Sequence, residues 1–209
     1  RAFGALRSRF ESGLPICPGQ PPPSAMPAAA PAPLPVDPAS DVVLQLGVPG
    51  WVYVAGAPRE LRARRGERAV ARARGHFVEV SGPDRAERGK ALARWYRRTA
   101  RELLGSALAA DAERLGLHPQ RLAIRDQRTR WGSCSTRGTV SLNWRLVMVP
   151  PPVARYVIVH ELCHLEHPNH SPAFWRALAA ALPEWRDGHS WLRRHALALM
   201  SYRPADSAL

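Results

Sequence analysis

The residues with the clearest chemical meaning lie in segment 152–167, which reads PVARYVIVHELCHLEH. Within it, His160, Glu161 and His164 form the pattern H-E-x-x-H. On a helix, side chains four positions apart lie on one face, so both imidazoles can reach one cation, and Glu161 is turned towards the side where a metal-bound water would sit. A catalytic zinc has three protein ligands and one exchangeable water. The spacing therefore predicts a catalytic zinc site that still lacks one ligand.

Two nearby histidines are candidates for the third ligand, since four of the eight histidines fall between residues 160 and 170. His167 is one further turn along the same face, but the proline after it favours an end of the helix there. In the next residues, PNHSP, the asparagine can adopt a left-handed turn and the serine can cap a new helix. This bend can bring His170 back over the metal. We therefore favour His170, with His167 and Glu184 as alternatives.

The elements that must position these residues begin with short valine-rich runs between residues 41 and 82, bounded by glycines. The runs VVLQLGV, GWVYVAG, ERAVARARG and HFVEVSG predict a meander of antiparallel strands. Strong helix formers follow from Arg85 to Leu115, with Asp84 as a candidate cap and Gly116 at the end. This spacing predicts one long helix.

The segment between this long helix and the H-E-x-x-H helix predicts two more strands, RLAIRDQ and TVSLNWRLVMV. Three prolines at 150–152 are expected to open the next helix. The edge of the strand over 140–146 is a candidate for binding an extended peptide as an added strand. Trp131 and Trp144 are expected to pack the sheet against the metal helix, and Gly132 suits a tight turn or a close backbone approach.

Length and composition predict a single α+β domain with an extension. Of the 209 residues, 21 are proline, and residues 1–40 are dominated by proline and alanine, which predicts a disordered tail. The folded domain is then expected over 41–203, with a strand-rich part at 41–82, the long helix at 85–115 and the metal-site part at 120–203. Three cysteines are too few for a disulfide scaffold, and no apolar run reaches the roughly 20 residues of a membrane span. We therefore expect a cytoplasmic protein with no membrane contact.

The net charge of +13 is concentrated in the middle of the chain. Residues 51–130 carry 18 arginines and one lysine against nine acidic residues. A basic region of this kind attracts polyanions, so nucleic acid or nucleotides are candidate partners of the arginine-rich residues 59–101. A coding bias towards arginine is the alternative interpretation.

Further residues extend the pattern beyond H-E-x-x-H. They are RWGSCS at 130–135, SLNWRL at 141–146, YVIVHELCHL at 156–165, and His170-Ser171 followed by Phe174-Trp175. Together these motifs resemble the YgjP-like family of zinc metallopeptidases, which is related to the WLM and SprT-like proteases. The resemblance covers residues 120–195 closely and residues 41–115 loosely.

This resemblance implies a zincin-like fold, in which a small sheet lies over the active-site helix. It implies one Zn²⁺ per chain bound by His160, His164 and His170, with Glu161 as the general base and a peptide or protein as substrate. The group that stabilises the oxyanion is not identified by the motifs. The candidates for this role or for substrate binding are Asn143, Arg145, Tyr156 and His189.

The function predicted from the sequence is therefore hydrolysis of peptide bonds by a metal-activated water, with a glutamate as general base. One alternative uses the same site to hydrolyse a nucleotide or phosphoanhydride, with arginines binding the phosphates. Another is a nucleic-acid-associated protease or binding protein that resembles the SprT-like proteins.

Overall fold

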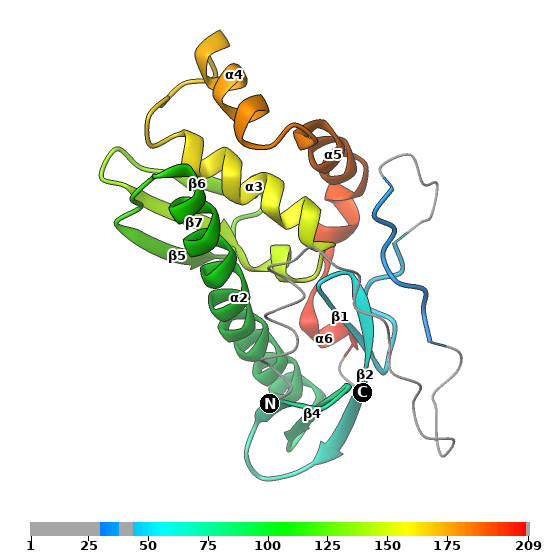
Figure 1. Ribbon diagram of the computed structural model, residues 1–209. Helices are drawn as coiled ribbons and strands as arrows, with labels where there is room; N and C mark the ends of the chain where they lie inside the picture. The colour runs from blue at the N-terminus through cyan, green and yellow to red at the C-terminus, as the bar shows by residue number, and fades with distance from the viewer. Residues whose placement is uncertain (1–29, 38–43, 208–209) are drawn as a thin grey trace.

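A computed structural model describes residues 30–37 and 44–207 of the chain. The fold is α+β, with two small sheets and several helices (Figure 1). The elements are β1 (Trp51–Val54), β2 (Ala57–Arg65), β3 (Val70–Arg74), β4 (Phe77–Gly82), α2 (Arg85–Leu115), β5 (Arg121–Arg125), β6 (Gly132–Cys134), β7 (Thr139–Asn143), the 3-10 helix η1 (Trp144–Val147), α3 (Pro151–Cys163), α4 (Pro172–Ala181), α5 (Trp185–Ser201) and α6 (Pro204–Ser207).

The first sheet has the strand order β1-β2-β4-β3, which differs from the predicted meander. Strand β2 pairs with β4 in parallel, and β3 lies at the edge, paired antiparallel with β4. The predicted strand VVLQLGV is not a strand over its described residues 44–48, whereas β2 was missed. The reason lies in the sequence of β2, APRELRARR, where arginines obscure the alternation and only Ala57 and Leu61 are fully buried.

The long helix α2 confirms the predicted bounds and both caps. The Asp84 side chain accepts a hydrogen bond from the backbone N–H of Glu87, and Gly116 ends the helix with a φ of 67°. This left-handed conformation favours glycine because glycine has no Cβ. The helix packs on strands β3, β4 and β5 and on η1, α3 and α6, so it connects the two sheets.

The second sheet has the strand order β5-β7-β6, with β7 in the centre. Strand β7 pairs in parallel with β5 and antiparallel with β6, so the predicted free edge over 140–146 is wrong. The backbone groups of residues 140–143 already have partners on both sides, and residues 144–147 form η1 instead of extending the strand. The edge that lies next to α3 belongs to β6.

The helices around the predicted metal site begin where the sequence predicts. Helix α3 has prolines in its first turn and ends at Cys163, and α4 begins at Pro172 with the Ser171 side chain accepting from the Phe174 N–H. The break between the two helices turns the chain back on itself (Figure 1). Among the helices of the described residues, none is long and apolar enough to cross a membrane.

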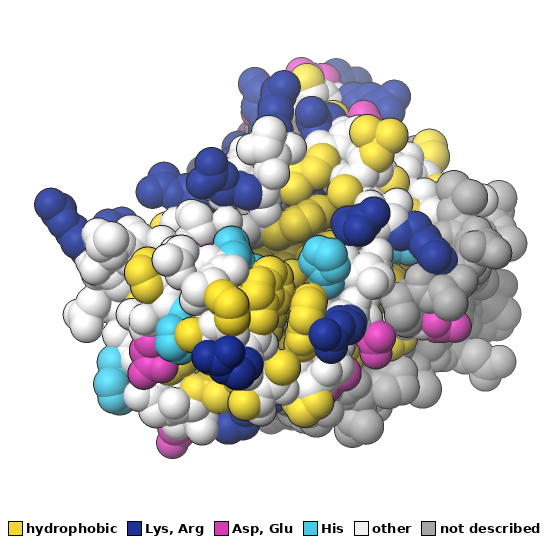
Figure 2. All heavy atoms as spheres, turned by 90° about the horizontal axis from the view of Figure 1, so that it is seen from above, with side chains coloured by type: hydrophobic (Ala, Val, Ile, Leu, Met, Phe, Trp, Pro, Cys, Tyr) yellow, Lys and Arg dark blue, Asp and Glu magenta, His cyan; other side chains and the backbone are white. Residues whose placement is uncertain are grey.

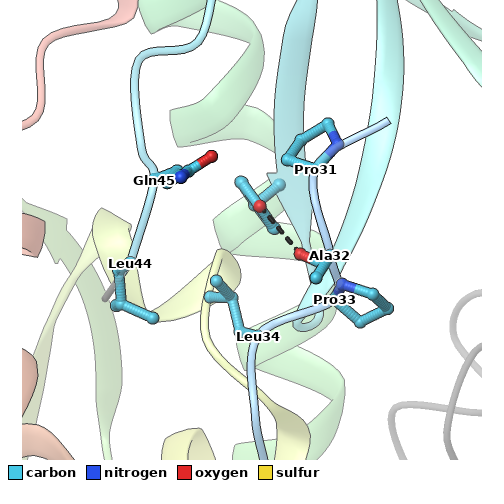
Figure 3. A pocket seen from close by; sticks show the side chains of 7 residues that line it. Pro31, Ala32, Pro33, Leu34, Leu44 and Gln45 are labelled. Carbon is cyan, nitrogen blue, oxygen red and sulfur yellow. Dashed lines mark hydrogen bonds between the residues drawn. The ribbon is translucent and has the colours of Figure 1, made fainter. Parts of the chain in front are cut away.

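Residues 30–37 pack on the domain, although their composition predicts a tail. Leu34 is buried, its N–H donates to the Gly56 carbonyl at 2.7 Å, and the Trp191 indole donates to the Pro35 carbonyl at 2.6 Å. The Tyr53 hydroxyl donates to the Ala32 carbonyl at 2.9 Å, beside a hollow between this segment and residues 44–45 (Figure 3). The rest of the predicted tail, residues 1–29 and 38–40, lies outside the described residues.

Candidate metal centre

Three histidines converge at the end of α3. His160 lies in the last turn of the helix, His164 is its C-terminal cap, and His170 lies in the loop before α4. One ring nitrogen of each lies within 4.8 Å of those of the other two. The Nε2 atoms of His160 and His170 are 3.0 Å apart. Two ligands of one tetrahedral zinc are separated by roughly 3.3 Å, so this spacing suits a shared ion.

The alternatives for the third position lie outside this group. His167 contributes its backbone carbonyl, which is 2.9 Å from Nδ1 of His164. A hydrogen bond from Nδ1–H to this carbonyl would leave Nε2 of His164 free to bind a metal, which is the usual arrangement for a ligand histidine. Glu184 lies at the N-terminus of α5 and is absent from the described cluster.

The ring of Phe174 packs against all three imidazoles. Its ring is fully buried, and its centroid lies 4.8, 4.6 and 4.7 Å from those of His160, His164 and His170. The first turn of α4 fixes Phe174 because the Ser171 cap binds its backbone N–H. Phe174 lies on the apolar face expected from helical periodicity, which predicts that its side chain is buried. The periodicity does not predict that it contacts the histidines.

Two of the three histidines, His160 and His170, have a lowered pKa. Burial lowers the pKa of His160 to about 3, with smaller contributions from His164, His170 and His189. The pKa of His170 is lowered too, by burial and by His164. Metal ligation requires an unprotonated imidazole nitrogen, so a low pKa leaves these rings ready to bind an ion at neutral pH.

Glu161 is buried beside the histidines, against strand β6. Burial raises the pKa of its carboxyl to about 8, and Arg130 acts in the opposite direction. A Cβ on Gly132 would lie 2.5 Å from Oε1 and 2.6 Å from Cγ of Glu161. The close backbone approach expected at Gly132 is therefore present, and it makes room for this carboxylate.

Two of the predicted substrate-binding residues lie in structural networks. Asn143 is fully buried, and its amide donates to the carbonyls of Gln127 and Arg130. Arg145 is 3% exposed and forms an ion pair with Asp126 at 2.6 Å. Because buried polar groups must be satisfied within the protein, both side chains are occupied in holding the loop after β5.

Tyr156 and His189 lie next to the histidine cluster. Tyr156 is one turn before His160 on α3, with ring centroids 5.8 Å apart, and its ring is 5.9 Å from that of His189 on α5. Burial, and then the charge of Glu161, raises the pKa of Tyr156 to about 12. The phenol therefore stays protonated at neutral pH and can donate a hydrogen bond.

A row of stacked aromatic rings extends from the cluster. His170 stacks on Trp175, and Trp175 stacks on Trp185, with centroid separations of 5.6 and 5.0 Å. Both tryptophans are half-buried and pack against the hydrophobic core, as their helical periodicity predicts. The face drawn in Figure 2 has hydrophobic side chains between histidines, with Lys and Arg side chains around them.

The chemistry of the donor set fits a metal ion. Three imidazoles converge, and Oε2 of Glu161 is a buried atom without a hydrogen-bond partner in the described part of the chain. Buried polar atoms in native proteins almost always have a partner, so orphaned atoms of this kind indicate an ion or water at the site. Three imidazole nitrogen donors with a carboxylate beside them match the ligand set of a catalytic metal site.

The comparison with known protein families agrees with this chemistry. The search of the curated proteins gave no match. Among solved structures, one similar chain is described as the crystal structure of the metallopeptidase zymogen of Pyrococcus abyssi abylysin. It is 23% identical, with a TM-score of 0.40, and the match covers 45% of this chain and 93% of that chain. The family model for the YgjP-like metallopeptidase domain matches residues 44–195, a span that includes the histidine cluster and Glu161. The chain therefore belongs to the YgjP-like metallopeptidase family.

Proposed function

We propose that this protein is a zinc-dependent peptidase of the zincin type, with His160, His164 and His170 as the metal ligands and Glu161 as the general base. The observation that carries the proposal is the convergence of three imidazoles beside a buried glutamate. Helix α3 supplies two ligands and the base, and the turn before α4 supplies the third ligand.

A bound zinc would polarise the scissile carbonyl and lower the pKa of its water towards about 7. Glu161 then accepts the proton of the attacking water and passes it to the leaving amine. Its burial favours this role because a carboxylate in a poorly solvated site is a stronger base than one in water. Gly132 keeps the carboxylate in position, since no side chain separates Glu161 from strand β6.

The role of stabilising the oxyanion is assigned to Tyr156, with His189 as the second candidate. A protonated phenol beside the metal ligands can donate to the developing negative charge, which is the usual function of an oxyanion hole. The buried contacts of Asn143 and Arg145 favour a structural role for these two side chains.

The binding site for the substrate backbone is assigned to the open edge of β6. Strand β6 pairs only with β7 within the described residues, and it contacts α3. An extended peptide can add to such an edge as a further strand, with main-chain hydrogen bonds that do not depend on its sequence. This edge replaces the 140–146 edge expected from the sequence.

The phosphoanhydride alternative depends on arginines near the metal. Strands β2 and β4 of the arginine-rich sheet lie at the opposite end of the molecule from α4 (Figure 1). Arg130, outside the 59–101 region, is the arginine whose charge acts on Glu161. These positions favour the peptidase.

The first test is zinc content and proteolysis of the untagged chain, since a histidine tag would itself bind zinc. We expect one zinc per chain and cleavage of an unfolded protein substrate. Glu161→Gln should keep the zinc and lose at least about 100-fold in kcat. Released phosphate from nucleotides, with the same dependence on Glu161, would instead support the phosphoanhydride alternative.

A matched pair of variants tests the third ligand. His170→Ala should lose zinc, and His167→Ala should keep it, because His167 contacts His164 through its backbone carbonyl, which alanine retains. Loss of zinc from His167→Ala with retention in His170→Ala would overturn the ligand assignment. Absence of any metal from the wild-type chain would overturn the proposed function.

A further inference from the structure

A polar cavity of about 210 Å³ lies where α2, the loop after β5, η1 and the turn between α5 and α6 meet. None of the residues that line it belongs to the histidine cluster. Its charged lining residues are Arg97, Arg128, Arg145, Arg203 and a single acid, Asp126.

The residues that line the cavity carry an excess of positive charge. Asp126 is shared by two arginines, with ion pairs of 2.9 Å to Arg97 and 2.6 Å to Arg145. Its Oδ1 also accepts from the Trp144 indole at 2.9 Å. Four guanidinium groups against one carboxylate leave a formal charge of +3. Clustered like charges repel each other in a partly desolvated site, so a bound anion would stabilise this arrangement.

Two of the four guanidinium groups are held in place before any ligand binds. Arg145 is 3% exposed, donates to the Tyr202 carbonyl at 3.2 Å, and lies 4.4 Å from the ring centroid of Trp144. The Arg203 guanidinium donates to the carbonyls of residues 200–202 at the end of α5. Fixed donors reduce the entropy lost when an anion is bound.

The other two arginines can reach a ligand from the rim. Arg97 is half exposed in its ion pair with Asp126. Arg128 is exposed and has neither a hydrogen bond nor an ion pair to any residue within 30–37 and 44–207. Its guanidinium donors are therefore available to an anion.

We propose that this cavity binds a phosphate group. Arginine forks match the oxygens of phosphate in pairs, and a phosphate carries up to two negative charges against the +3 of the lining. The volume is below the roughly 300–1,000 Å³ of sites for drug-sized ligands, so it suits a small group better than a whole organic molecule. The phosphate is free in solution or belongs to a nucleic acid, and the site is separate from the proposed peptidase reaction.

The test is calorimetric titration of the untagged, zinc-loaded protein with inorganic phosphate at low salt. The double variant Arg97→Ala/Arg128→Ala should weaken binding by about tenfold or more, as expected for loss of charged hydrogen bonds. The matched control is Arg101→Ala/Arg125→Ala, which removes the same charge from exposed arginines of α2 and β5 that do not line the cavity. If the double variant fails to fold, the single variant Arg128→Ala, which keeps the ion pairs of Asp126, is titrated in its place.

Several outcomes would overturn this proposal. If both double variants weaken phosphate binding equally, phosphate is attracted by the overall positive charge of the protein. If both keep the wild-type affinity, phosphate binds elsewhere, for example at the metal. Absence of binding to the wild-type protein at millimolar phosphate would exclude the site.

A second titration identifies the source of the phosphate, using a short single-stranded DNA with and without a 5′-phosphate. Binding of the phosphorylated form alone, displaced by inorganic phosphate, indicates a terminal phosphate. Equal binding and displacement of both forms indicates backbone phosphates. DNA that phosphate does not displace binds elsewhere and counts against the cavity as a nucleic-acid site.

Discussion

Gly132 is the residue whose replacement gives the most direct test of how Glu161 is positioned. A Cβ at this position would lie 2.5 Å from Oε1, so Gly132→Ala must displace the carboxylate or move strand β6. A displacement of about 1 Å in a catalytic group lowers turnover by about 100-fold. We therefore expect Gly132→Ala to lose about 100-fold in kcat while it keeps its zinc, as measured by proteolysis and elemental analysis.

Gly105→Ala is the matched control for this prediction. Gly105 lies in α2, and its Cβ would come no closer than 3.4 Å, to a methyl group of Leu122. Alanine in a helix interior is more stable than glycine by about 0.5–1 kcal/mol, so this variant should keep full activity. Wild-type turnover in Gly132→Ala would contradict the assigned role of Gly132.

The raised pKa of Glu161 predicts how the stability of the metal-free protein depends on pH. The carboxyl has a pKa of about 8 in the folded chain and 4.5 as its ordinary value. Between these values the unfolded chain loses this proton and the folded chain keeps it, so the wild-type protein loses stability as pH rises. The loss is at most about 1.4 kcal/mol per pH unit, and it ends above pH 8.

Urea unfolding of chelator-treated protein measures this effect. Glu161→Gln lacks the ionisation, so its stability advantage over the wild type should grow from pH 4.5 to pH 8. Glu166→Gln, at an exposed position five residues further on, serves as the control and should show no such trend. An advantage that shrinks with rising pH would contradict the assigned direction of the Glu161 pKa.

At the scale of single residues, the sequence predicted which histidines lie together, but it did not predict which polar side chains are buried. The H-E-x-x-H spacing and the break after His167 were sufficient to choose the three histidines that the structure brings together. Asn143 and Arg145 were candidates for stabilising the oxyanion or for binding the substrate. Their partners, the carbonyls of the 127–130 loop and the carboxylate of Asp126, come from other segments of the chain, so local sequence could not reveal their burial.

At the scale of elements, Asp111 connects the long helix to the metal helix. It is buried on α2, and its carboxylate accepts from Arg155 of α3 at 2.9–3.2 Å and from Arg114 at 2.7 Å. Asp111→Ala removes these charged hydrogen bonds and should lower the free energy of unfolding by about 1–3 kcal/mol. Urea unfolding checks this value.

The control for Asp111 is Glu102→Ala, which removes an acidic side chain at an exposed position of the same helix. It should change stability by less than about 0.5 kcal/mol, as is usual for surface substitutions. Equal destabilisation by the two variants would mean that the loss of negative charge, and not the α2–α3 contact, determines the effect.

The elements also show which local signals are reliable. Helix α2 begins and ends at capping residues, α3 begins at its prolines, and α4 begins at the Ser171 cap; these signals depend only on neighbours in the sequence. Strands depend on pairing with distant segments. The parallel pairing of β2 with β4 and the central position of β7 therefore could not be read from alternation alone.

At the scale of the whole molecule, composition predicts the average character of a segment and misses its exceptions. The composition of the proline-rich segment 1–40 predicts a solvated chain. Residues 30–37 nevertheless pack between β1 and α5 through one buried leucine and backbone carbonyls. Proline supports such packing because an extended chain with fixed φ loses less entropy when it is held against a surface. The partners of this segment are far away in the sequence, so composition gave no sign of them.

Leu34 tests whether residues 30–37 are part of the stable domain. Its side chain is 5% exposed, whereas that of Val36, two residues further on, is 55% exposed. Leu34→Ala removes a buried side chain and should lower the free energy of unfolding by about 2 kcal/mol or more, and Val36→Ala should change it by less than about 0.5 kcal/mol. Unfolding followed by tryptophan fluorescence is suitable because Trp191 donates to the carbonyl of Pro35. Equal, small effects of both variants would mean that the domain is stable without this segment and begins closer to residue 41, as its composition predicts.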